Sequence, residues 1–196
     1  MNLSELIYNS RNQLKPSWLL SSVICIFYAL IISVPSELNA FGELLSILLA
    51  GPLQLGLCIY FLKISKGSNP SFNYIFDGFK PLLNILLAFL SINLITLIGL
   101  FFFIIPGIIL SLGLSMTYYI IAENPEISFH KAIEKSWKIM DGHKMQLFKL
   151  HLYFIPWYIL GILFFIVGVF VVMPWHNLSL ANYYKVISEN NFELTN

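Results

Sequence analysis

The stretch that decides the fold is residues 81–122, PLLNILLAFLSINLITLIGLFFFIIPGIILSLGLSMTYYIIA, which contains no Asp, Glu, Lys or Arg. A helix needs about 20 apolar residues to cross a hydrocarbon core of ~30 Å, so this stretch is long enough for two crossings. Only helices and closed barrels can span lipid, and the chain must therefore turn within it. We expect the turn near Gly99; the alternative is the step at Pro106 and Gly107.

The composition of the whole chain supports the same interpretation. Of 196 residues, 58% are hydrophobic and 11% are charged, whereas about a quarter of the residues of a soluble domain are charged. A water-soluble fold is therefore excluded, and we predict an all-α, polytopic membrane protein with a single integral membrane domain over residues 1–196. The apolar runs predict about six transmembrane helices in three hairpins, at residues 17–34, 42–62, 81–98, 100–122, 145–166 and 169–187.

Two features of the apolar runs bear on processing and redox chemistry. A polar segment of roughly 16 residues precedes the first run, which is unlike a signal peptide, so we expect that run to be retained as a span. Cys25 and Cys58 both lie inside apolar runs. A thiol there packs as a small apolar side chain, and neither a disulfide framework nor a metal site is predicted.

The basic residues predict the orientation of the chain. With six spans, all eleven Lys and Arg residues fall on one side, and the opposite connections carry only Glu37 and Glu43. Lys and Arg are retained on the cytoplasmic side of a membrane. We therefore expect both termini to be cytoplasmic.

The chain also contains signs of an internal repeat, with units at residues 1–65, 66–127 and 128–187. Each unit has a Ser that we expect to cap a short amphipathic helix, then a Lys at the membrane edge, and the three lysines are 65 and 64 residues apart. A proline recurs in each returning span, followed by an aromatic pair. The alternative is that any three short hairpins in a membrane of fixed thickness would show a similar period. The lysines are Lys15, Lys80 and Lys144, and the prolines are Pro52, Pro106 and Pro174.

The amphipathic segments are predicted to lie in the headgroup plane. In the third, Phe129, Ile133, Trp137 and Met140 share one helical face and the lysines share the other, as in interfacial helices. Each Lys near the surface favours anionic lipid by roughly 1 kcal/mol. Simple anchoring is the alternative to specific lipid binding. The candidate lipid-headgroup contacts are Lys80, Lys131, Lys135, Lys138 and Lys144.

Uncharged polar residues at mid-depth are the second candidate site. Gln54 and His176 each follow a repeat proline by two residues, and at 1.5 Å per residue both lie roughly 13 Å from the basic edge. A helix broken at proline frees backbone carbonyls that polar side chains can satisfy. We predict a polar cavity that opens towards the cytoplasm; the alternative is hydrogen bonding between helices. Its candidate residues are Gln54, His176, Asn177, Asn182 and Tyr183.

Several sequence motifs resemble a known family. They are Ile105-Pro106-Gly107-Ile108, the Ser-Met-Thr-Tyr-Tyr stretch from Ser115, Glu123-Asn124-Pro125, the segment from Lys131 to Lys144, and the ending from Pro174 to Tyr184. Together they resemble an uncharacterised family of six-helix bacterial integral membrane proteins, similar to the membrane region fused to some glycerophosphodiester phosphodiesterases. The resemblance implies the fold and a location in the bacterial cytoplasmic membrane. It implies no activity and no catalytic residue.

The chemistry-bearing residues point away from an enzyme. The sequence shows no Gly-rich phosphate loop, nucleophile elbow or paired-carboxylate site, and His130, His143 and His151 do not form a zinc set. We expect Asp77 and Asp141 to pair with their neighbouring lysines. The leading hypothesis is a non-enzymatic module that organises or binds lipids, anionic lipids among them, or another membrane protein, with no cofactor and no nucleic acid. The alternative is a transporter or carrier for a lipid-like or amphipathic solute.

Overall fold

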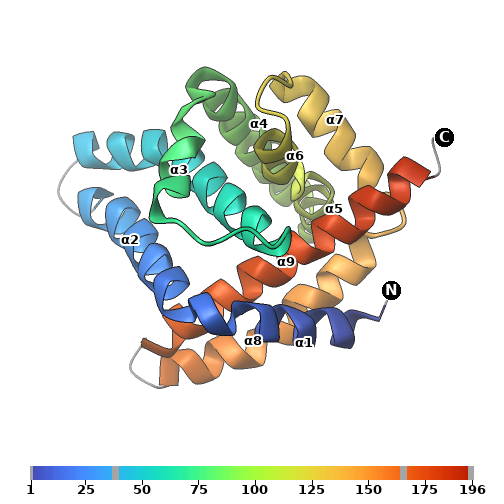
Figure 1. The fold of residues 1–196 in the computed structure, drawn as a ribbon. Coiled ribbons are helices and arrows are strands. Elements are labelled where there is room, and N and C mark those ends of the chain that lie inside the picture. The colour runs from blue at the N-terminus through green and yellow to red at the C-terminus, as the bar shows by residue number, and fades with distance from the viewer. Residues whose placement is uncertain (1, 37–39, 164–166, 194–196) are drawn as a thin grey trace.

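A computed structural model describes residues 2–36, 40–163 and 167–193, and the elements within these ranges are all helices (Figure 1). The all-helical prediction is confirmed for these residues, and five stretches long and apolar enough to cross a membrane support a membrane protein, whereas the arrangement of six spans in three hairpins stays a prediction. The principal elements are α1 (Leu3–Leu14), α2 (Trp18–Ser36), α3 (Ala40–Ser65), the 3-10 helix η2 (Phe72–Phe79), α4 (Leu82–Phe102), α5 (Ile104–Leu114), α6 (Thr117–Glu123), α7 (Phe129–Ile139), α8 (Lys144–Leu163) and α9 (Val167–Glu193).

Three pairs of long helices pack side by side: α2 with α3, α4 with α5, and α8 with α9. Five stretches within the described residues are long and apolar enough to cross a membrane: Leu3–Pro35, Phe41–Ser65, Leu82–Phe102, Ile104–Glu123 and Lys144–Leu163. The first stretch begins at Leu3 rather than at the predicted residue 17, because it takes in α1 as well as α2. The ends of the other four differ from the predicted ones by a few residues, as helix ends usually do.

The helix α9 is not among these five stretches, and its position explains why. It runs through the middle of the molecule (Figure 1) and packs against α1, α2, α3 and α8. Its side chains from Leu178 to Ile187 are largely buried against protein. A helix surrounded by other helices can carry polar residues at positions that a lipid-facing helix fills with apolar ones.

The turn between the third and fourth predicted spans lies at Phe103, so the expectation of a turn near Gly99 was wrong. Phe103 has an extended backbone, with φ −160° and ψ 143°. Gly99 instead remains helical at a close approach of α4 and α5, where a Cβ on it would lie 3.0 Å from the Cα of Gly107. Pro106 occupies the first turn of α5, where its missing N–H costs no helical hydrogen bond.

The predicted fourth span is also interrupted. The chain makes a turn at Ser115 and Met116, between α5 and α6. The hydroxyls of Ser115 and Thr117 bond to the carbonyls of Leu112 and Leu114, at 2.7 and 2.8 Å. These bonds satisfy backbone groups that the interruption of the helix leaves open.

Each short amphipathic element packs against a different returning helix. Helix α1 lies on α9, η2 lies on α3, and α7 lies on α6 and α5. The serines do not cap these helices as expected: Ser4 lies inside α1, and Ser71 and Ser128 occupy N-cap positions without a side-chain capping bond. The second element is a 3-10 helix. The three repeat units stay a prediction, and the Glu37 to Phe41 connection includes residues 37–39, which lie outside the described ranges.

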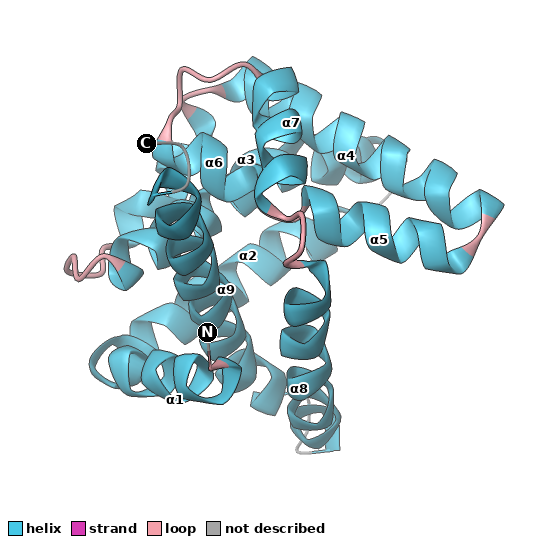
Figure 2. Cartoon of the chain, turned by 90° about the vertical axis from the view of Figure 1, so that its right-hand side faces the viewer, coloured by secondary structure: helices cyan, strands magenta, loops and turns pink. Residues whose placement is uncertain are grey.

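The hairpin tips are far less buried than the middle of the molecule. Figure 2 shows α4 and α5 reaching sideways together, away from α8. At the α4–α5 tip, Phe101 is 86% exposed and Ile105 is 71% exposed, and at the end of α8 Leu163 is 73% exposed. Apolar side chains exposed on a polytopic helical protein are suited to contact with lipid acyl chains. The packed core therefore lies near the end of the bundle that carries α1, η2 and α7, called here the lysine-bearing end.

Candidate functional site

The lysine-bearing end is built by backbone-to-backbone packing of η2 on α3. A Cβ at Gly56 would lie 2.0 Å from the carbonyl oxygen of Ile75, and a Cβ at Gly78 would lie 2.0 Å from that of Pro52. Only glycine fits such an approach. The Ile75 side chain is fully buried as a result, which fixes the depth of η2 against α3.

This packing brings three charged side chains together. The Asp77 carboxylate lies 2.8 Å from the Lys80 ammonium and 3.7 Å from that of Lys63. The Lys63 ammonium also lies over the Tyr74 ring, 3.6 Å from its centroid, which is a cation–π contact. Lys80 keeps 76% of its side chain exposed. The sequence-based pairing of Asp77 with Lys80 is therefore present in the structure, and most of the Lys80 side chain stays exposed.

Helix α7 presents two of the predicted headgroup lysines outward. The Ser136 hydroxyl donates to the Gly113 carbonyl at 2.8 Å, which holds α7 on the end of α5. On the opposite side Lys131 and Lys138 are exposed. The Lys138 ammonium donates to Glu134 at 2.7 Å, and this bond lowers the pKa of the Glu134 carboxyl.

Two further lysines predicted to contact headgroups, Lys135 on α7 and Lys144 at the start of α8, are less accessible. Lys135 is half-buried. Lys144 has 21% of its side chain exposed and lies 3.8 Å from Asp141, and its ammonium is 4.1 Å from the centroid of the Trp137 ring. Trp137 in turn covers Gly113, where a Cβ would lie 2.5 Å from the ring. Lys144 therefore helps to pack α7.

One polar junction was not predicted. Glu123, at the end of α6, accepts hydrogen bonds from the Lys66 ammonium and, at 2.8 Å, from the Tyr184 hydroxyl. The rings of Tyr119 and Tyr184 stack 5.4 Å apart. This junction links α6 and α9 to the chain just after α3. The Glu123-Asn124-Pro125 motif and the aromatic pairs were the signals that could have located it.

His176 belongs to a hydrogen-bonded triad within the helices. Its Nε2 lies 3.0 Å from Nδ1 of His151, and its Nδ1 lies 2.9 Å from the Tyr158 hydroxyl. The Phe154 ring stacks on the imidazole of His176, with 4.6 Å between centroids. His151 and Tyr158 lie seven residues apart on α8, two turns of one helical face. That spacing could have identified them as partners for His176.

The other predicted cavity residues bond elsewhere. Gln54 accepts from the Tyr28 hydroxyl at 3.0 Å, which joins α3 to α2. Asn177 donates to the Met173 carbonyl, one turn earlier in the helix, and the Tyr183 hydroxyl donates to the His143 carbonyl, both within 2.9 Å. The structure therefore distributes Gln54, His176, Asn177 and Tyr183 among separate hydrogen-bonded groups.

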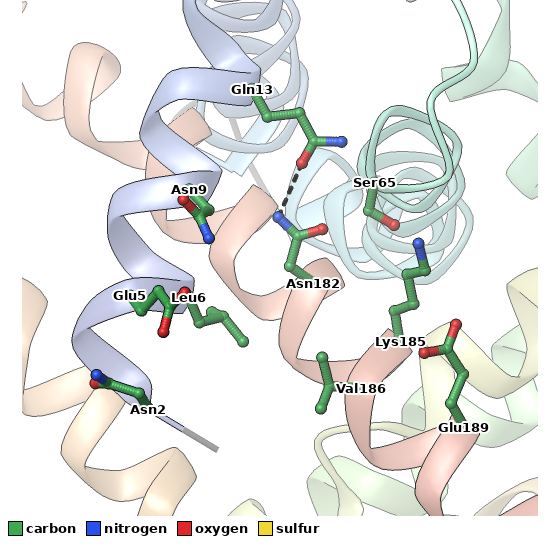
Figure 3. A pocket seen from close by; sticks show the side chains of 10 residues that line it. All are labelled: Asn2, Glu5, Leu6, Asn9, Gln13, Ser65, Asn182, Lys185, Val186 and Glu189. Carbon is green, nitrogen blue, oxygen red and sulfur yellow. Dashed lines mark hydrogen bonds between the residues drawn. The ribbon is translucent and has the colours of Figure 1, made fainter.

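Asn182, one of the five, lines a hollow at the lysine-bearing end. Its amide donates to Ser10 at 2.8 Å and to Gln13 at 3.0 Å, and the Gln13 amide donates to the Ile64 carbonyl at 2.7 Å. A polar pocket of about 450 Å³ opens beside these bonds, between α1, α9 and the end of α3 (Figure 3). The residues that line it are Asn2, Glu5, Leu6, Asn9, Gln13, Ser65, Asn182, Lys185, Val186 and Glu189.

The fold and these contacts define a polytopic helical membrane protein in which short amphipathic helices cross the returning helices at one end. The model of a family described as "protein of unknown function (DUF975)" matches residues 93–191, just over half of the chain, and the chain belongs to this family. No curated protein matches it, and no solved structure matches it. The likeness to the membrane region of glycerophosphodiester phosphodiesterases stays a prediction.

Proposed function

We propose that this protein is a non-enzymatic membrane module that binds anionic phospholipids at the cytoplasmic leaflet. The observation that carries the proposal is the outward display of Lys131 and Lys138 on α7, a helix fixed to the end of α5 by Ser136. Anionic lipid attracts such lysines by roughly 1 kcal/mol each. The exposed Trp137 on the same helix has the amphipathic ring typical of a membrane interface.

The orientation is part of the proposal. If α9 is the sixth crossing, shielded from lipid by the helices around it, the chain crosses six times and both termini lie on one side. The basic residues then place the lysine-bearing end in the cytoplasm. A bacterial inner membrane, which the family resemblance implies, has a cytoplasmic leaflet where α7 would meet anionic headgroups.

The alternative function, transport of a lipid-like or amphipathic solute, has less support. It was motivated by polar residues at mid-depth, and those side chains bond to protein groups in separate clusters. Polar side chains that satisfy one another typically join membrane helices. Binding of another membrane protein remains a further alternative, because the exposed hairpin tips suit either lipid or protein.

The test measures how phosphatidylglycerol stabilises the protein. A ligand that binds the native state raises the melting temperature, so wild-type protein in phosphatidylcholine nanodiscs should melt at a higher temperature when phosphatidylglycerol is added. The double variant Lys131→Gln/Lys138→Gln should lose most of this rise. His130→Gln, an exposed neutral change on the same helix, is the matched control and should keep it. An equal rise in the wild type and the double variant would contradict the proposal.

A further inference from the structure

Two adjoining hollows lie between α3, α6, the start of α4 and the loop that joins α6 to α7. Their volumes are about 610 and 160 Å³, and they share Lys80, Pro81 and Pro125. The Asn84 amide donates to the Ile127 carbonyl at 2.7 Å and holds this loop against α4. The two hollows, called here the α4 groove, therefore have a fixed wall on the loop side.

The α4 groove has an apolar floor and an apolar lip. Leu55 and Ile121, from α3 and α6, form part of the floor and are at most 1% exposed. At the lip, Leu82 and Leu83 are 46% and 73% exposed. They begin α4, one of the helices long and apolar enough to cross the membrane. An acyl chain at the membrane edge can therefore follow the lip while a headgroup occupies the larger hollow.

The charges at the mouth of the α4 groove balance. Lys63 and Lys80 supply two positive charges, and Asp77 and Glu126 supply two negative ones. Lys80 is paired with Asp77 on one wall, and Glu126 is exposed on the opposing loop. A purely anionic headgroup would meet Glu126 unfavourably, whereas a headgroup with both signs can satisfy both walls.

We infer that the α4 groove binds one zwitterionic glycerophospholipid of the ethanolamine type. Its phosphate lies beside Lys80, its ammonium lies beside Glu126, and an acyl chain lies over Leu82 and Leu83. The inference rests on the proposed lipid-binding function and adds to it a specific site with a headgroup preference opposite to that of α7.

The test is native mass spectrometry of the full chain after incubation with phosphatidylethanolamine and phosphatidylglycerol that carry the same acyl chains. The wild type should retain one phosphatidylethanolamine in preference. Lys80→Gln should reduce retention of both lipids. Glu126→Gln should shift the retained ratio towards phosphatidylglycerol by about two- to fivefold, the size expected for one exposed charge pair. A wild-type preference for phosphatidylglycerol at this one-lipid level, or an unchanged ratio in Glu126→Gln, would overturn the inference.

Controls separate the α4 groove from the rest of the lipid surface. Lys149→Gln removes an exposed lysine of α8 and should leave retention unchanged, whereas Ala122→Leu fills the floor and should abolish it. Glycerophosphoethanolamine, which lacks acyl chains, should compete poorly; equal competition would refute the apolar part of the site. Suppose that Lys80→Gln retains as much lipid as the wild type, while Lys131→Gln/Lys138→Gln loses the rise in melting temperature with phosphatidylglycerol. The inferred lipid site in the α4 groove is then wrong and the proposed function stands. If no variant and no wild-type sample retains or responds to phospholipid, both fail.

Discussion

Glycine sets the closest contacts of this protein at the residue scale. At Gly56 and Gly78 the hydrogen in place of a side chain lets η2 touch the backbone of α3, and at Gly99 and Gly107 it lets α4 touch α5. Small residues bring helix backbones together in membranes, where burial of apolar surface gives no advantage over lipid. Van der Waals contact and interhelical hydrogen bonds must then provide the stability.

The first prediction concerns Gly56. Gly56→Ala should lower the melting temperature, because its Cβ would overlap the Ile75 carbonyl and displace η2; overpacking of this kind costs about 1–3 kcal/mol. Gly51→Ala on the same helix is the matched control, since its Cβ would lie 3.1 Å from the Phe89 Cβ and 3.5 Å from the Ile85 carbonyl oxygen, without the overlap found at Gly56. Differential scanning fluorimetry in detergent compares them. Equal melting temperatures for the two variants would show that η2 does not lie on the backbone of α3.

The second prediction concerns His176. His176→Leu should lower the melting temperature and leave retained lipid unchanged, because the change strands the Tyr158 hydroxyl and His151 Nδ1 without their shared partner. Adding Tyr158→Phe to His176→Leu should lower the stability little more than His176→Leu alone does. Interhelical hydrogen bonds in membranes average about 0.6 kcal/mol, and the bonds of this triad are lost together. If His176→Leu instead melts like the wild type but loses bound lipid, His176 lines a binding cavity.

At the element scale, apolar periodicity predicted the helices well and their ends poorly. The segment at α7 showed its helical period in the sequence, and the structure has a helix there. The turn at Phe103 was missed because Gly99 looks equally suited to a turn and to a close helix crossing, and only the partner Gly107 decides between them. The seven-residue spacing places His151 and Tyr158 on one face of α8, but their contacts with His176 also depend on how α8 packs on α9.

The third prediction concerns the attachment of α1. Asn182→Ala should loosen α1, because it removes both donations from α9 to Ser10 and Gln13. Hydrogen exchange followed by mass spectrometry should then show faster exchange over Leu3–Leu14 and unchanged exchange over Phe129–Ile139. The Trp175 indole still donates to the Ile7 carbonyl at 3.0 Å, so α1 should loosen without full release. Unchanged exchange in α1 would mean that its other contacts, including Trp175 with Ile7 and Gln13 with Ile64, hold it without Asn182.

At the scale of the whole molecule, each amphipathic element packs on a returning helix, and the first of these elements packs on the last helix of the chain. Within the described residues η2 packs on α3 and α7 packs on α6, each on the returning helix before it, and α1 packs on α9, the last one. The first and last parts of the chain therefore meet. The aromatic pairs predicted from the sequence lie inside this arrangement, with Tyr60, Tyr119 and Tyr184 all buried.

The last prediction is the topology, in which both termini are cytoplasmic and the Glu37 to Phe41 connection is external. With Cys25 and Cys58 replaced by Ala, a cysteine at Asn39 should react in intact cells with a membrane-impermeant maleimide. A cysteine at Asn73, an exposed position of η2 at the lysine-bearing end, should react only after the cells are opened. The reasoning is that Lys and Arg resist transfer across the membrane, and an even number of crossings keeps all eleven of them on one side. Labelling of Asn39→Cys only from the cytoplasmic side would reverse the orientation and move the α7 lysines and the α4 groove to the opposite leaflet.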